Sequence, residues 1–95
     1  EALYRGDLLS PEDRASLVAI TPQSVASGID LYGLGTMQVT RGGRSVVGHT
    51  GSTDGFRAEV FIDLDTGLCV AVLANDFFSS PKAVAEPVWE ALSAY

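Results

Sequence analysis

The sequence is poor in cationic side chains, with six Lys and Arg residues against twelve Asp and Glu residues and a formal net charge of −6. A nucleic-acid-binding surface requires clustered Lys and Arg, so this charge balance argues against a nucleic-acid partner. Long hydrophobic runs are also lacking, because no apolar stretch approaches the roughly 18 residues of a membrane-spanning helix. We therefore expect no nucleic-acid binding and no membrane span.

Cysteine and histidine are scarce, with one residue of each. Cys69 lies in an apolar run, residues 68–74, which predicts a buried free thiol. The carboxylates of Asp63, Asp65 and Asp76 match no calcium-loop spacing, so we interpret these residues as solvated turn residues. We accordingly expect no metal ion and no cofactor.

Apolar residues make up 46% of the chain and charged residues 19%, which is ordinary for a globular domain. A chain of 95 residues suits one domain, although so small a domain is only marginally stable alone. Residues 1–4 look like the middle of a folded segment. We therefore expect residues 1–95 to be one unit that was cut from something longer.

The first part of the chain, residues 1–30, is expected to be a helical segment followed by a loop. Ser10 is a typical N-cap, and a proline and two acidic residues follow it in the first helical turn. The helix should end at Ala19 or Ile20, shortly before a second proline. Residues 21–30 then form a polar loop.

Residues 31–75 are expected to form antiparallel strands. The predicted strands are residues 31–40, 45–50, 56–64 and 68–74, and glycine-containing turns join them. Apolar and charged side chains alternate in residues 56–64, which is typical of a strand with one face in water. The apolar side would consist of Phe56, Ala58, Val60, Ile62 and Leu64, and the solvated side of Arg57, Glu59 and Asp63, with Phe61 as the exception to the alternation.

The last segment, residues 80–95, is expected to be a C-terminal helix, because Ser80 and Pro81 form a second helix start and apolar side chains follow at helical spacing. Together, the predicted helices and strands indicate an α+β fold, in which an antiparallel sheet of three to four strands has the C-terminal helix packed on it. Residues 68–74 are apolar on both faces, yet they have only one certain neighbour in the sequence. Their other edge is therefore expected to be bare.

The chemistry is concentrated in residues 46–55. This stretch brings the only histidine, His49, to the end of a strand and follows it with the hydroxyl of Thr50 and with Gly51. An imidazole can gain or lose a proton near neutral pH, and a glycine leaves the backbone beside it open. A lone histidine at a strand end is more often structural than catalytic, so the tripeptide alone is a weak signal.

Four short motifs follow one another in the chain: Tyr32-Gly33-Leu34-Gly35, Gly48-His49-Thr50-Gly51, Gly55-Phe56 and Val72-Leu73-Ala74-Asn75. In this order and spacing they resemble the C-terminal part of the penicillin-recognising serine hydrolases. They are most similar to the branch of class C β-lactamases, D-Ala-D-Ala carboxypeptidases and related esterases. The resemblance spans essentially the whole chain. It implies a fragment of the β-lactamase/transpeptidase-like fold, export to the periplasm or the cell exterior, and a small-molecule acyl substrate.

The resemblance also implies roles for individual residues. The third motif of the family is Lys-Thr-Gly, or His-Thr-Gly in some members, and His49, Thr50 and Gly51 match the second form. His49 and Thr50 would face the nucleophile, assist proton movement and hold the substrate carboxylate. Gly51 would leave room for the substrate along the strand, and the backbone N–H of Ser52 would be an oxyanion-hole donor.

The two other family motifs, Ser-x-x-Lys with the nucleophile and Tyr-x-Asn, precede this region in the family. The one Ser-x-x-Lys string of this chain, residues 79–82, follows the His-Thr-Gly strand, and we interpret it as a helix cap. We therefore expect the chain alone to be inactive. Its partner would be the remaining N-terminal part of the same protein, or a second copy paired through residues 68–74. The alternative is a non-catalytic binding or interaction module on the same fold.

Overall fold

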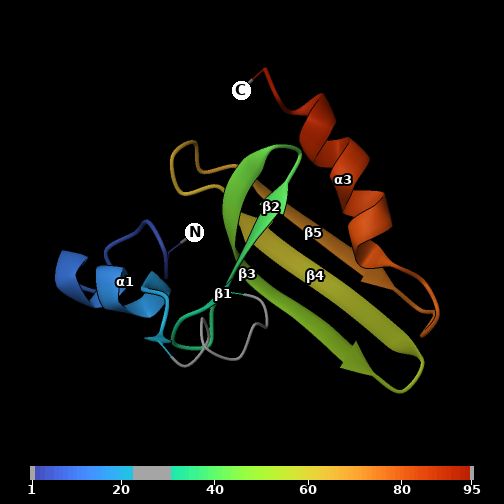
Figure 1. Ribbon diagram of the computed structural model, residues 1–95, viewed down its shortest axis with the longest axis horizontal. Coiled ribbons are helices and arrows are strands. Elements are labelled where there is room, and N and C mark those ends of the chain that lie inside the picture. The colour runs from blue at the N-terminus through green and yellow to red at the C-terminus, as the bar shows by residue number, and fades with distance from the viewer. Residues whose placement is uncertain (1, 23–30, 95) are drawn as a thin grey trace.

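The computed structural model describes residues 2–22 and 31–94 of the chain (Figure 1). The elements are α1 (Pro11–Val18), β1 (Leu31–Tyr32), β2 (Met37–Arg41), β3 (Arg44–Thr53), β4 (Phe56–Ile62), β5 (Cys69–Ala74) and α3 (Pro81–Ala91). The described strands form one antiparallel sheet in the order β1-β2-β3-β4-β5. The predicted α+β class is confirmed. The sheet has five strands instead of three to four, because residues 33–36 divide the strand predicted over residues 31–40.

The N-terminal segment begins its helix where the sequence predicts. Ser10 is the N-cap of α1, and its side chain accepts a hydrogen bond from the N–H of Asp13 at 3.1 Å. The helix ends at Val18, slightly earlier than predicted, because Ala19 is already extended. α1 lies beside the β1 end of the sheet, away from α3 (Figure 1). Most of the loop predicted over residues 21–30 falls outside the described residues.

A tight glycine turn joins β2 to β3. Gly42 and Gly43 have φ angles of 52° and 77°, the left-handed region that a two-residue hairpin turn requires. A Cβ atom on Gly42 would lie 2.8 Å from the backbone of Trp89, and the N–H of Gly42 donates to the Glu86 carboxylate at 2.8 Å. The turn is therefore held against α3, which fixes the start of β3.

The hydrophobic core lies between α3 and one face of the sheet (Figure 1). Ser80 begins the helix as its N-cap and accepts from the N–H of Ala83 at 3.3 Å. The core consists of Val46, Phe61, Val70, Ala85 and Trp89, with Met37, Val39, Leu68, Val72 and Leu92 packed against it. The predicted packing of the C-terminal helix on the sheet is thus confirmed. Of the two described helices, neither is long and apolar enough to cross a membrane.

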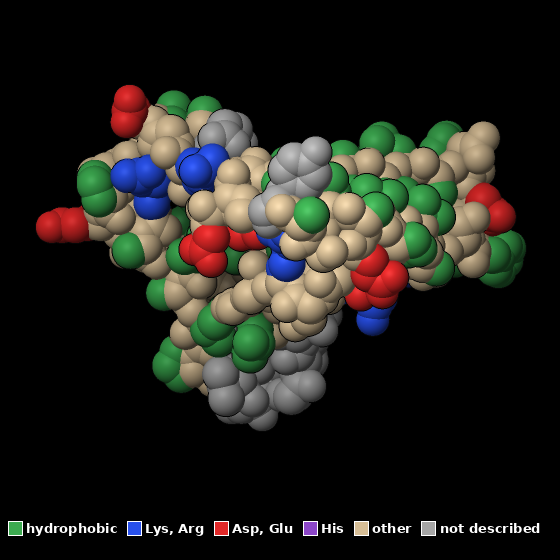
Figure 2. Space-filling model, turned by 90° about the horizontal axis from the view of Figure 1, so that it is seen from above, with side chains coloured by type: hydrophobic (Ala, Val, Ile, Leu, Met, Phe, Trp, Pro, Cys, Tyr) green, Lys and Arg blue, Asp and Glu red, His purple; other side chains and the backbone are tan. Residues whose placement is uncertain are grey.

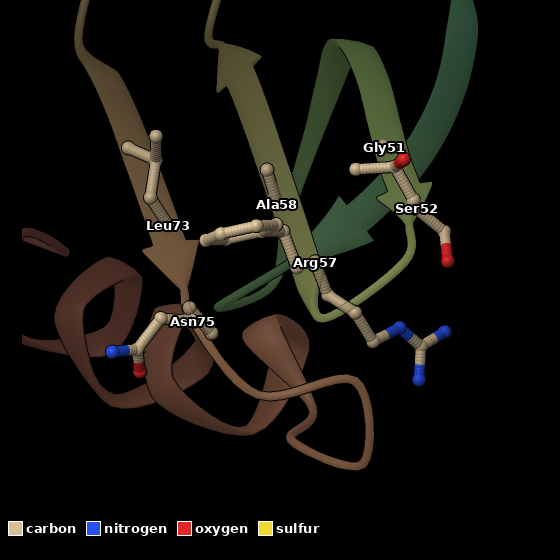
Figure 3. Close-up of a pocket in the computed structure, with 9 residues that line it drawn as sticks. Gly51, Ser52, Arg57, Ala58, Leu73 and Asn75 are labelled. Carbon is tan, nitrogen blue, oxygen red and sulfur yellow. The ribbon is translucent and has the colours of Figure 1, made fainter.

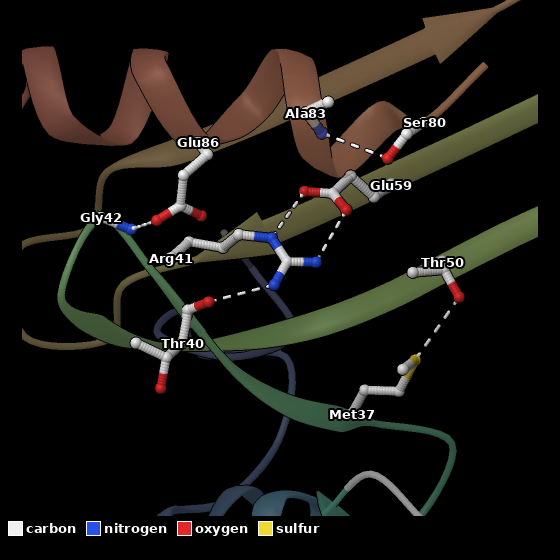
Figure 4. A network of polar contacts seen from close by, with 9 residues as sticks. All are labelled: Met37, Thr40, Arg41, Gly42, Thr50, Glu59, Ser80, Ala83 and Glu86. Atoms are coloured by element: carbon white, nitrogen blue, oxygen red, sulfur yellow. Dashed lines mark hydrogen bonds and ion pairs between the residues drawn. The ribbon is translucent and has the colours of Figure 1, made fainter.

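The charged side of β4 is the side that faces α3. Glu59 and Asp63 are 3% and 5% exposed, whereas Val60 is 46% exposed. The predicted solvation of Glu59 and Asp63 is therefore wrong. Both carboxylates are paired beneath the helix: Arg41 donates to the two oxygens of Glu59 at 3.0 and 2.9 Å (Figure 4), and Arg44 donates to Asp63 at 2.6 Å. Burial of a charge is tolerated when such a partner is present.

The opposite face of the sheet is uncovered over β5 and the adjoining part of β4 in the described residues. We call this surface the open face; it consists of Phe56, Val60, Cys69, Ala71 and Leu73, all exposed. Leu73 is 83% exposed, and Cys69 is exposed where the sequence predicts a buried thiol, because its side of β5 has no covering layer. Hydrophobic side chains reach the surface along the right-hand part of the molecule in Figure 2. Among the described strands β5 pairs only with β4, so its other edge is bare.

Candidate functional site

The C-terminal half of β3 extends beyond the end of β2. β2 pairs with residues 44–48, whereas β4 pairs with residues 47–53. Residues 49–53 therefore have a strand on one side only within the described part of the chain, and alternate N–H and C=O groups face the free edge. This edge holds the four candidate site residues, His49, Thr50, Gly51 and Ser52.

Strand alternation separates the side chains of His49 and Thr50. His49 lies opposite Val60, on the side of the open face, and Thr50 lies opposite Glu59, on the side of α3. The two side chains therefore lie on opposite faces of the sheet. They meet at the strand edge, where Nδ1 of His49 contacts the carbonyl oxygen of Thr50.

The His49 ring has a second partner that the sequence analysis did not assign. The hydroxyl of Tyr32 lies 2.8 Å from Nε2 of His49, and the two rings meet edge to face with centroids 5.6 Å apart. The strand register explains the contact, since Tyr32 pairs with Met37 and Met37 pairs with Gly48, the neighbour of His49. The motif around Tyr32 was visible in the sequence, but nothing in its spacing indicates a contact with the histidine.

The Thr50 hydroxyl lies on the α3 side of the sheet, where it donates to Sδ of Met37 at 3.6 Å (Figure 4). A small pocket of about 170 Å³ adjoins it, and Ser52, Arg57 and Lys82 are among the residues that line this pocket. The side chains of Arg57 and Lys82 are exposed cations. Two cations beside hydroxyl groups make this side of the edge favourable for an anionic group.

Gly51 is not required by the packing of the sheet. A Cβ atom at this position would contact only the Cβ atom of Ala58, at an ordinary 3.8 Å, and Gly51 is not among the glycines with positive φ. Gly51 borders a larger pocket of about 510 Å³ at the ends of β3, β4 and β5 (Figure 3). Leu73 and Asn75 come from the β5 side of this pocket. The missing side chain therefore keeps space open at the edge without serving the fold.

The Ser-x-x-Lys string is a helix start in the structure, as the sequence predicts. Ser80 caps α3, and Lys82 extends from its first turn into solvent. The carbonyl of Ser79 accepts a long hydrogen bond from Arg57, at 3.5 Å. No group of three His, Cys, Asp or Glu side chains within residues 2–22 and 31–94 is placed to hold a metal ion.

Comparison of the sequence with models of known protein families identified one matching family. The family model described as Beta-lactamase matches residues 2–95, nearly the whole chain. Comparisons with curated proteins and with solved structures gave no match. The matched range includes every element from α1 to α3, and with them the free edge of β3.

Proposed function

The chain belongs to the beta-lactamase family, and we propose that residues 1–95 form the C-terminal portion of a beta-lactamase-like domain in a serine acyl-hydrolase. In this proposal the chain supplies the His-Thr-Gly strand, which binds the substrate and stabilises negative charge in the transition state. The observation that carries the proposal is the free edge of β3 at residues 49–53. A strand edge offers rigid N–H donors and space for an extended acyl substrate.

Each candidate residue has a role that fits its position. His49 assists proton movement, and the Thr50 hydroxyl binds the substrate carboxylate. Gly51 gives the substrate access to the strand, which fits the absence of any packing requirement for a glycine there. The backbone N–H of Ser52 is one oxyanion-hole donor, and loss of such a donor typically costs about 3 kcal/mol of transition-state stabilisation.

The charges near Thr50 favour a substrate that carries a carboxylate. Arg57 lies directly opposite Ser52 in the β3–β4 ladder, and Lys82 lines the same pocket. The acidic residue in that lining, Glu59, is paired with Arg41 at 2.9 Å. D-Ala-D-Ala peptides, β-lactams and simple esters are the candidate substrate classes, and the excess of positive charge supports the first two.

The nucleophile of the proposed enzyme lies outside this chain, on the remaining N-terminal part of the same protein. Ser79 and Lys82 do not provide it, because their segment is the capped start of α3. The open face offers a surface for that N-terminal part, since apolar side chains of β4 and β5 line a pocket of about 300 Å³ next to His49. Burial of such a surface stabilises an assembly.

A non-catalytic interaction module on the same fold is the second candidate. The observation that favours it is the combination of the open face with the bare edge of β5, which are suited to pairing with a second copy through residues 68–74. In this case His49 would have a structural role, and the occupant of the β5 edge would be another copy of this chain.

Acylation by a labelled penicillin tests the proposal. The chain alone is expected to hydrolyse no β-lactam or activated ester above background, because it lacks the nucleophile. The parent protein is expected to form a labelled acyl-enzyme at a serine N-terminal to this region. Trapping of the label on a serine within residues 1–95, or absence of any acyl-enzyme in an intact parent protein, would contradict the proposal. The second of these results, together with self-association, would favour the interaction module.

A further inference from the structure

Both ring nitrogens of His49 have a partner. Nδ1 contacts the carbonyl oxygen of Thr50, and Nε2 lies 2.8 Å from the hydroxyl oxygen of Tyr32. The phenol and imidazole rings stand nearly perpendicular, at an interplanar angle of 83°. The His49 side chain is exposed, so these two contacts, and not burial, hold the ring in place.

The two partners define where the imidazole carries its proton. A carbonyl oxygen only accepts hydrogen bonds, so Nδ1 must be the protonated nitrogen that donates to Thr50. In the neutral ring Nε2 is then the acceptor, and the Tyr32 hydroxyl donates to it. When the ring is doubly protonated, Nε2 donates and the Tyr32 oxygen accepts, so the contact persists in both states. Free imidazole side chains prefer the proton on Nε2, so the site imposes the opposite tautomer.

The fold holds Tyr32 firmly for this task. Its carbonyl accepts from the N–H of Thr21 at 2.9 Å, and the next residue, Gly33, donates to the carbonyl of Thr36 at 2.7 Å. A Cβ atom on Gly33 would lie 2.6 Å from the carbonyl oxygen of Leu17, so only glycine allows the loop to approach the end of α1 this closely. The backbone around Tyr32 is thus held by pairing with Met37 of β2 and by a hydrogen bond from the N–H of Leu34 to the carbonyl of Leu17 in α1, at 3.1 Å.

We propose that Tyr32 is a positioning residue for His49, and that its hydroxyl fixes both the ring orientation and the Nδ1–H tautomer of the imidazole. The proposal deepens the proposed function and rests on it, because a fixed tautomer matters only if His49 handles a proton. Tyr32 thus holds the neutral His49 ring in one protonation pattern, and the Nε2 lone pair faces the Tyr32 hydroxyl. Without the hydroxyl, the ring would rotate and populate both tautomers.

Nitrogen NMR spectra of the imidazole ring test this directly. The chain contains a single histidine, so the ring signals need no assignment among several residues. At a pH where the ring is neutral, the wild-type chain is expected to show a protonated Nδ1 and an unprotonated Nε2. Tyr32→Phe keeps the aromatic ring and removes the hydroxyl, and it should shift the spectrum towards the Nε2–H tautomer.

Tyr4→Phe is the matched control, because Tyr4 also loses a side-chain hydrogen bond, to the Thr36 hydroxyl at 3.1 Å, but does not contact His49. It should leave the imidazole pattern unchanged. A wild-type ring protonated at Nε2, or an unchanged pattern in Tyr32→Phe, would overturn the proposal. If Tyr32→Phe fails to fold, a wild-type ring protonated at Nε2 still overturns the proposal. These spectra need no substrate, so their failure is distinct from failure of the proposed function, which the acylation of the parent protein tests.

Discussion

Thr50 lies directly across the β3–β4 ladder from Glu59, and the Glu59 carboxylate is held at both oxygens by the guanidinium group of Arg41 (Figure 4). Arg41 also lies over the Phe61 ring, 5.2 Å from its centroid, and donates to the carbonyl of Thr40 at 3.0 Å. The free edge of β3 therefore rests on a buried ion pair, because Arg41 and Glu59 are only 6% and 3% exposed.

Removal of one partner of this pair should strongly destabilise the chain. Glu59→Ala leaves the Arg41 charge buried without its counter-ion, which should lower the free energy of unfolding by about 3–5 kcal/mol. The double replacement Arg41→Met with Glu59→Leu should have a much smaller effect, since no charge remains unpaired. Denaturant unfolding measures both, with Glu90→Ala on the exposed side of α3 as the control. A double variant as unstable as Glu59→Ala would contradict this explanation.

In the proposed parent enzyme, His49→Ala should lower kcat/KM roughly tenfold to a thousandfold, the range expected for a positioned acid–base or charge-stabilising group. Thr50→Ala should have a smaller effect, because its hydroxyl is one donor among several. Ser45→Ala is the control, since Ser45 lies on the same strand but at its paired end. Steady-state kinetics give the comparison. Wild-type kinetics in His49→Ala would reduce the histidine to a structural role.

The elements of the fold were predictable where the signal is local. Both helix starts depend on a serine followed by a proline, and the β2–β3 turn depends on two adjacent glycines. The His-Thr-Gly tripeptide was also found, because it is contiguous in the sequence. Its position on a free strand edge follows from the extra length of β3, which the sequence predicted only as far as Thr50.

The features that the sequence did not predict depend on distant partners. The alternation in β4 gives the period of the strand but does not tell which face is covered. The carboxylates of Glu59 and Asp63 are buried because Arg41 and Arg44 pair with them, and these arginines lie 18 and 19 residues away in the sequence. The contact between Tyr32 and His49 spans 17 residues and two hairpin registers. No local pattern carries that information.

Stability should depend on pH through Asp63. Burial opposes ionisation of its carboxyl group, but hydrogen bonds from Arg44, Thr66 and the N–H groups of Asp65 and Thr66 outweigh it and lower the pKa of Asp63 below its ordinary value. A lowered pKa contributes stability that is complete above the ordinary pKa of about 4 and is lost as pH falls through the lowered value. The difference in unfolding free energy between the wild type and Asp63→Asn should therefore be largest near neutral pH and shrink below about pH 4. A constant difference down to pH 2 would contradict this.

The open face and the bare edge of β5 should make the isolated chain associate. Leu73 is 83% exposed beside an unpaired strand edge, so water contacts both apolar surface and free backbone groups there. Leu73→Lys places a charge on this surface without disturbing the core, and it should yield a folded monomer. Val70→Lys should instead unfold the chain, because Val70 is buried beneath α3.

Sedimentation at increasing concentration distinguishes these outcomes. The wild-type chain should associate more strongly as concentration rises, and Leu34→Lys should behave like it, because Leu34 is also exposed, at 62%, but lies outside β4 and β5. The added N-terminal part of the parent protein should suppress association by covering the same surface. A wild-type chain that stays monomeric at high concentration, with slow amide exchange throughout residues 68–74, would show that the chain protects its own β5 edge. The open face would then be neither an interface with the rest of the protein nor one between two copies.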